Sequence, residues 1–120
     1  MKVEYYNPEE GNCIYRSLSK ALNKKYEEIK NELNEISNEL NIDDIFDDKV
    51  FEKYMNNYNF SKIDNYDIDF LKNKFNGINI IYAKDKDWYH MICVIDNIIY
   101  NKFDLEKLKN MKIINVYKKQ

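Results

Sequence analysis

The segment WYHMICVIDNIIY (residues 88–100) decides the fold, because it predicts two antiparallel strands joined by a tight turn. Both halves of the segment are rich in apolar residues, and Asp96-Asn97 between them is typical of a two-residue hairpin turn. The stretch INIIY at 78–82 predicts a strand before this hairpin, and KIINVY at 112–117 predicts a last strand after it. The C-terminal part of the chain is therefore expected to form an antiparallel sheet.

The N-terminal part predicts helices instead. Asn12 is a good N-cap for a helix over 13–22. Apolar residues spaced three or four positions apart predict a second helix over 26–40. Further helices are expected around 50–58 and over 67–75, the latter ended by the Asn-Gly pair that follows it. Residues 2–6 read as a short edge strand or an arm. Helices followed by antiparallel strands predict an α+β fold with segregated layers.

Length and composition bound the class of protein. A chain of 120 residues is expected to form a single domain over 1–120. The net charge of −2 with no basic block argues against a nucleic-acid surface, and no apolar run approaches the roughly 18 residues of a membrane span. The first residues lack the apolar stretch of a signal peptide, and two cysteines then read as free thiols in a reducing compartment. A cytoplasmic protein, of the producing or the host cell, is expected.

Cys13 is the candidate nucleophile. It lies in GNCIYRSLS (11–19), after a predicted turn over 7–11 and at the first turn of the predicted helix. The positive end of the helix dipole favours the thiolate, which is the form that attacks carbonyl carbon. The alternative is a buried core cysteine, which is the usual fate of a free thiol.

His90 is the one imidazole in the chain and the candidate base. A hairpin turning at residues 96–97 pairs positions that sum to about 193, so it sets Asn101 opposite Ile92. Asn101 is then a diagonal neighbour of His90 on one face of the hairpin and can orient its ring. Asp104 is the rival orienter. The alternatives are a core histidine and an asparagine that caps the strand end.

Other residues are assigned around these three. The backbone N–H of the nucleophile with the side chain of Asn7 or Asn12 is expected to hold an oxyanion, although Asn7 equally suits capping a turn. Trp88 and Tyr89 flank the histidine and are expected to line a substrate groove or to pack in the core. Cys93 is expected to be a packed core thiol. No C-x-x-C pair is present, so neither a metal nor another cofactor is expected.

Two resemblances follow from these motifs. The stretch around Cys13 resembles the nucleophile motif of OTU-type deubiquitinating proteases, with Glu10 where that motif has Asp. The C-terminal stretch HMICVIDNIIYNKFD (90–104) resembles small papain-like proteins of phages and bacterial mobile elements. The resemblance implies a papain-like cysteine peptidase fold with Cys13 as nucleophile, His90 as base and Asn101 as orienter. It covers both ends of the chain and leaves residues 41–77 unexplained.

The sequence therefore predicts a papain-like thiol hydrolase that cleaves a peptide or isopeptide bond in a protein or peptide substrate. Two alternatives remain at this stage. One is a papain-like binding or anti-defence protein without turnover, since a chain of 120 residues leaves little room for a deep groove. The other is an acyl or glutamyl transferase that uses the same cysteine and histidine with an amine acceptor.

Overall fold

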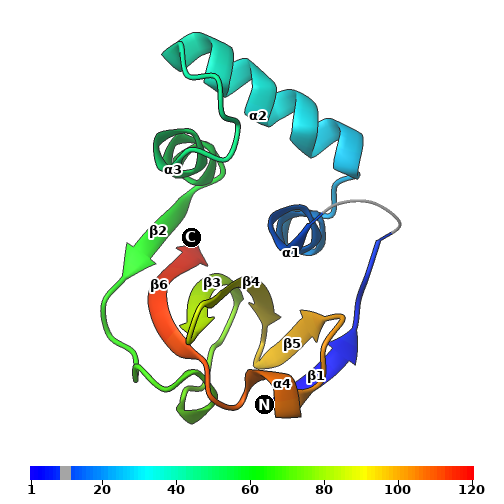
Figure 1. Cartoon of the computed structure of the whole chain (residues 1–120), viewed down its shortest axis with the longest axis vertical. Coiled ribbons are helices and arrows are strands. Elements are labelled where there is room, and N and C mark those ends of the chain that lie inside the picture. The colour runs from blue at the N-terminus through cyan, green and yellow to red at the C-terminus, as the bar shows by residue number, and fades with distance from the viewer. Residues whose placement is uncertain (9–11) are drawn as a thin grey trace.

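The computed structural model describes residues 1–8 and 12–120, and within them helices cover one face of a mixed β-sheet (Figure 1). The predicted α+β class is confirmed. The helices are α1 (Cys13–Leu22), α2 (Tyr26–Leu40), α3 (Asp48–Asn57) and α4 (Leu105–Leu108), with a 3₁₀ turn, η1, at Phe70–Lys72. The strands are β1 (Lys2–Tyr5), β2 (Phe60–Ile63), β3 (Ile78–Asp85), β4 (Trp88–Ile95), β5 (Ile98–Asn101) and β6 (Lys112–Lys119).

The strands of the sheet follow the order β1-β5-β4-β3-β6-β2. All neighbours are antiparallel except β1, which pairs in parallel with β5. The expectation of a wholly antiparallel sheet is therefore wrong at this edge. An edge strand can add in either direction, and nothing local in residues 2–5 specifies the direction of a partner almost a hundred residues away.

The β4–β5 hairpin has the predicted register. Cys93 pairs with Tyr100 and Ile95 with Ile98, so paired positions sum to 193. Asp96 and Asn97 have φ values of 47° and 65°, the left-handed conformation that a two-residue hairpin turn of this type requires. Asx residues adopt this conformation at lower cost than most others, which explains why the turn lies here.

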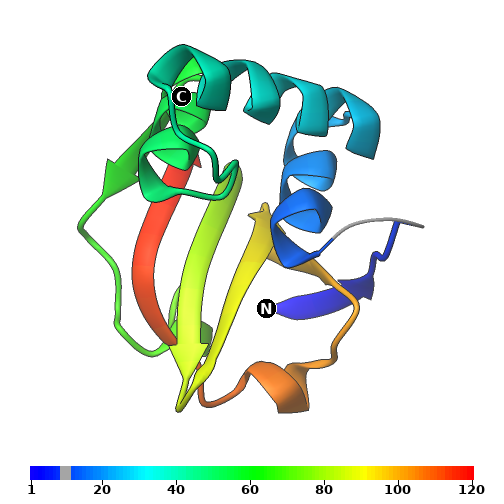
Figure 2. The same ribbon diagram turned by 45° about the horizontal axis from the view of Figure 1, so that its top comes forward.

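Alternation along β4 divides the core into two layers. The side chains of Met91 and Cys93 join the cluster beneath α1, α2 and α3. Ile92 and Val94 point the other way, into a cluster that α4 and the η1 segment cover. Figure 2 shows the first three helices together on one side of the sheet. Because side chains alternate along a strand, His90 lies on the face of Ile92, the face turned away from α1.

Residues 60–75 differ from the sequence-based expectation. The helix predicted over 67–75 is absent, and only the 3₁₀ turn η1 forms there. Asn73 explains this, because its Nδ2 donates to the carbonyls of Asp67, Asp69 and Phe70 and so holds the backbone in a loop. Strand β2, which pairs antiparallel with β6, was not expected.

The sequence also predicted a turn over 7–11 and no membrane span. The turn predicted over 7–11 falls partly on residues 9–11, which lie outside the described residues, as does Glu10. No helix in the described part of the chain is long and apolar enough to cross a membrane.

Candidate functional site

Cys13 is the first residue of α1, and its side chain is partly buried. Asn12 caps the helix, because its Oδ1 accepts hydrogen bonds from the backbone N–H groups of Ile14 and Tyr15. The N–H of Arg16 is the first to donate within the helix, to the Asn12 carbonyl. The Cys13 N–H is therefore left without an acceptor among the described residues. A free N–H at a helix N-terminus suits a developing negative charge on a bound oxygen.

Helix α1 lies along an open edge of β4. Strand β4 pairs with β5 only from Cys93 onward, and Cys93 lies opposite Tyr100. Among the described residues, those of β4 before Cys93 have no strand partner on this side. Beyond this pair, the Met91 carbonyl accepts a hydrogen bond of 3.0 Å from Ser17 Oγ. The Ser17 hydroxyl of α1 thus bonds to a part of β4 that does not pair with β5.

A second contact gives the direction of α1 along β4. One turn after Ser17, the Lys20 ammonium lies 4.2 Å from the centre of the Tyr100 ring, and Tyr100 pairs with Cys93. Ser17 itself contacts Met91, so α1 and β4 run in the same direction. Cys13 is one turn before Ser17 on the same side of the helix. The contacts therefore continue toward Tyr89, the residue before His90, as α1 reaches its first residue.

His90 is bonded to Asn101 on the neighbouring strand. The distance from His90 Nε2 to Asn101 Oδ1 is 3.2 Å, and the same oxygen accepts from the backbone N–H of Lys102 at 3.0 Å. A backbone N–H donor fixes this atom of Asn101 as the amide oxygen, so Nε2 must carry the proton. In the neutral ring Nδ1 then has the lone pair. No hydrogen bond of Nδ1, to Cys13 or to another described residue, is present.

Aromatic rings enclose the imidazole. The Trp88 ring stacks on it with centroids 4.8 Å apart, and the Phe103 ring meets it edge-on at 5.5 Å. His90 is 3% exposed. This burial lowers the pKa of His90 to about 4, with a smaller opposing effect from the bond to Asn101 and a further lowering by the Arg16 and Lys102 cations. The ring is therefore neutral at pH 7.

Arg16 is the buried cation of the site. Its side chain is 4% exposed, and its Nε donates to Asn7 Oδ1 at 3.4 Å. Burial lowers the pKa of Arg16, and the nearby Cys13 opposes this effect. Two buried donors have no acceptor among the described residues, Arg16 Nη1 and Asn101 Nδ2. Both residues lie near His90, since Asn101 is bonded to the imidazole and the charge of Arg16 acts on it.

The remaining predicted residues lie as follows. Asp104 caps α4, with its Oδ1 accepting from the Lys107 N–H, and does not bond to His90. Trp88 and Tyr89 lie on opposite faces of β4, so they do not line one groove together. Tyr89 is half exposed and stacks on Tyr82, on the face that carries α1.

The second thiol of the chain lies inside the core. Cys93 is fully buried among apolar side chains, which raises its pKa to about 12. Within residues 1–8 and 12–120, no group of three or more His, Cys, Asp or Glu side chains is arranged to hold a metal ion.

Sequence reasoning missed Ser17 and Phe103. Ser17 is four residues after Cys13, so it lies on the same side of the helix, and a hydroxyl there was the available signal. Phe103 is two residues after Asn101 and follows the end of β5. Its contact with His90 depends on how the chain leaves the strand, for which the sequence carries no periodic signal.

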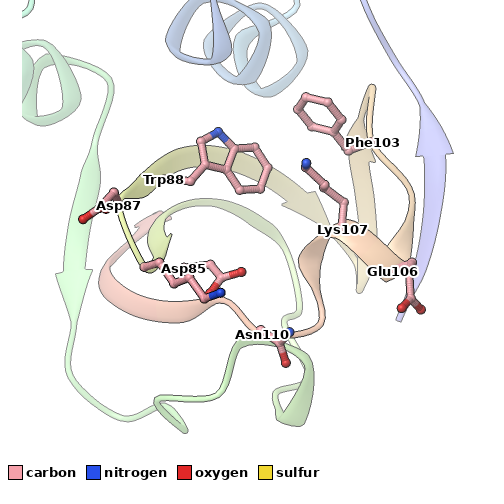
Figure 3. A pocket seen from close by; sticks show the side chains of 8 residues that line it. Asp85, Asp87, Trp88, Phe103, Glu106, Lys107 and Asn110 are labelled. Carbon is pink, nitrogen blue, oxygen red and sulfur yellow. The ribbon is translucent and has the colours of Figure 1, made fainter.

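A cavity of about 650 Å³ adjoins the far side of the aromatic rings. Figure 3 shows Trp88, Phe103 and Lys107 pointing toward one another at one end of this cavity, with Asp85 and Asn110 at the other. The Lys107 ammonium lies 5.2 Å from the Trp88 ring centre. Trp88 and Phe103 thus contact His90 on one side and line the cavity on the other.

Comparison of the chain with protein-family models, with curated proteins and with solved structures gave no match.

Proposed function

We propose that this chain is a papain-like thiol hydrolase that cleaves a peptide or isopeptide bond through an acyl-enzyme. The observation that carries the proposal is the contact series of α1 on the open edge of β4. Lys20 lies at Tyr100 and Ser17 at Met91, so the series leads the start of α1 toward Tyr89, the residue before His90, and the charge of Arg16 on α1 acts on His90. The hydrogen bond that fixes the tautomer of His90 is the second support.

In the proposed first step Cys13 Sγ bonds to the carbonyl carbon of the substrate, and its proton passes to His90 Nδ1. Nδ1 then gives this proton to the amide nitrogen as the C–N bond breaks, which releases the amine and leaves a thioester. Water next adds to the thioester carbon and gives a proton to Nδ1. The C–S bond breaks, the carboxylic acid leaves, and the proton returns to sulfur.

The role of the protein in these steps is to hold groups in place. Asn101 keeps the Nε2 proton directed away from the thiol, so that the lone pair of Nδ1 is available. The N–H of Cys13, which has no acceptor among the described residues, donates to the oxyanion. The Oδ1 atoms of Asn12 and Asn7 already accept hydrogen bonds, from the start of α1 and from Arg16, so the Nδ2 group of either residue is the candidate for a second donor.

The state of His90 favours a second candidate function, a papain-like binding protein without turnover. The ring is buried, neutral and without a hydrogen bond to Cys13, which is not the resting ion pair of an activated thiol. In the hydrolase, thiolate formation must itself raise the pKa of the ring, since an opposite charge nearby favours the imidazolium. The two functions thus differ in whether thiol and imidazole meet at the open edge of β4.

Turnover of the intact chain tests the proposal. Fluorogenic peptides and an isopeptide-linked protein pair are incubated with the wild type, with Cys13→Ser and with the matched control Cys93→Ala. The proposal expects cleavage that Cys13→Ser lowers about 10³-fold or more and that Cys93→Ala changes less than threefold. Acid quenching should trap a thioester on Cys13, seen by mass spectrometry. Cleavage that survives Cys13→Ser, or the absence of both cleavage and thioester, overturns the hydrolase.

A further inference from the structure

A second cavity, of about 450 Å³, lies on the α1 side of the sheet. Its walls come from the start of α1, from α3 with the loop before it, and from four strands, β2, β3, β4 and β6. Most of the lining side chains are apolar or aromatic, namely Ile14, Phe46, Phe51, Tyr82, Met91, Ile114 and Tyr117. A cavity of this size and lining is within the range of sites that take a single side chain or a small ligand.

This cavity adjoins Cys13. Ile14, the next residue of α1, is part of its wall, and Tyr82 pairs with Met91, to which α1 is bonded through Ser17. Tyr82 and Asp48 line the cavity together, and the pKa of Tyr82 is raised first by burial and also by Tyr89, Asp48 and Cys13. A substrate bound at Cys13 can therefore place a neighbouring side chain in this cavity.

Two carboxylates, of Asp48 and Glu52, and one ammonium group, of Lys62, line the cavity. Glu52 is already partnered, since its Oε1 lies 2.9 Å from the Lys62 ammonium and accepts from the Tyr117 hydroxyl at 2.6 Å. Asp48, in the first turn of α3, has no ion pair among the described residues, and its charge acts on both Tyr82 and Tyr117. The net result is one uncompensated carboxylate beside two phenol rings.

We propose that this cavity is a specificity subsite that takes an arginine or lysine side chain of the polypeptide substrate. The aliphatic stem of such a side chain fits the apolar wall, and its cationic end meets Asp48 and the faces of Tyr82 and Tyr117. A glutamate side chain would meet a like charge there, and a purely aliphatic one would leave Asp48 without a partner. The inference rests on the proposed function in taking Cys13 as the reacting group.

Labelling of Cys13 by peptide electrophiles tests the subsite without requiring turnover. Tripeptide chloromethyl ketones are compared that differ only in arginine, its neutral isostere citrulline, or norleucine at each of the three positions. Labelling rates are normalised to that of iodoacetamide. The variants are Asp48→Asn and, as the matched control, Asp43→Asn, which removes a charge from an exposed position just before α3.

At one of the three positions, arginine should label at least tenfold faster than citrulline or norleucine. Asp48→Asn should reduce this preference below threefold, and Asp43→Asn should leave it unchanged. Equal rates at all positions, a preference that survives Asp48→Asn, or no labelling by peptides while iodoacetamide reacts, overturns the subsite. The preference without any peptide cleavage supports the subsite and contradicts the hydrolase, whereas cleavage without the preference does the reverse.

Discussion

At the scale of single residues, His90 governs the site. Histidines near neutrality serve as bases because small environmental changes move them across physiological pH. Here two aromatic rings and the sheet exclude water from the imidazole, and the resulting pKa of about 4 keeps it neutral at pH 7. Asn101 fixes which nitrogen has the lone pair. Burial therefore dominates the pKa of His90, whereas Asn101 sets the tautomer and opposes part of the pKa shift.

The burial of His90 predicts an acid-sensitive stability. The folded chain binds the His90 proton less tightly than the unfolded chain, whose histidine has a pKa near 6.5. The contribution to stability is therefore fully present above about pH 6.5 and is lost as the pH falls toward 4. Between pH 7 and 4.5 the wild type should lose about 2.5 kcal/mol more free energy of unfolding than His90→Gln.

Urea unfolding of both proteins at these two pH values measures this difference. All other titrating groups are common to the two chains, so they cancel in the comparison. Parallel losses in wild type and His90→Gln would show that the imidazole is not desolvated in the folded state.

At the scale of elements, the joint between α1 and β4 positions the cysteine. Ser17 Oγ donates a buried hydrogen bond to the Met91 carbonyl, in the part of β4 that does not pair with β5. Ser17→Ala leaves that carbonyl without a partner and should cost about 1–3 kcal/mol of unfolding free energy. It should also slow alkylation of Cys13, because α1 is then less firmly seated against β4.

Ser37→Ala is the matched control for this prediction, because it removes a buried hydroxyl from α2 instead. Thermal unfolding and the iodoacetamide rate are measured on both variants. If Ser17→Ala destabilises the fold but leaves the Cys13 rate unchanged, the α1–β4 joint does not position the thiol.

Elements with a strong local signal are those that the sequence predicts well. Asn12 caps α1 as expected, and the Asp96-Asn97 turn fixes the register that brings Asn101 to His90. The sequence does not show in the same way where a side chain bonds to the backbone in place of a helix, or which distant strands pair. The Asn73 side chain bonds to the backbone and holds residues 67–75 in a loop where a helix was predicted. Strand β1 pairs in parallel with β5, which lies far along the chain.

At the scale of the whole molecule, the candidate site joins the two ends of the sequence. Cys13 and His90 are 90 − 13 = 77 residues apart, and helices α2 and α3 occupy much of the sequence between them. The sheet carries cavities on both sides of β4, one beyond Trp88 and one beside Ile14. Residues 41–77, which the resemblance leaves unexplained, include α3, and α3 forms one wall of the second cavity.

The measurement that tests the central claim most directly is the rate at which iodoacetamide modifies Cys13 at pH 6.5. The account predicts that Cys13 reacts at least tenfold faster than free cysteine, and that His90→Gln and Asn101→Ala each remove most of this advantage. Cys93, fully buried with a pKa of about 12, should stay unmodified in the folded chain. A Cys13 that reacts like free cysteine and is indifferent to both substitutions would contradict a working pair of thiol and imidazole.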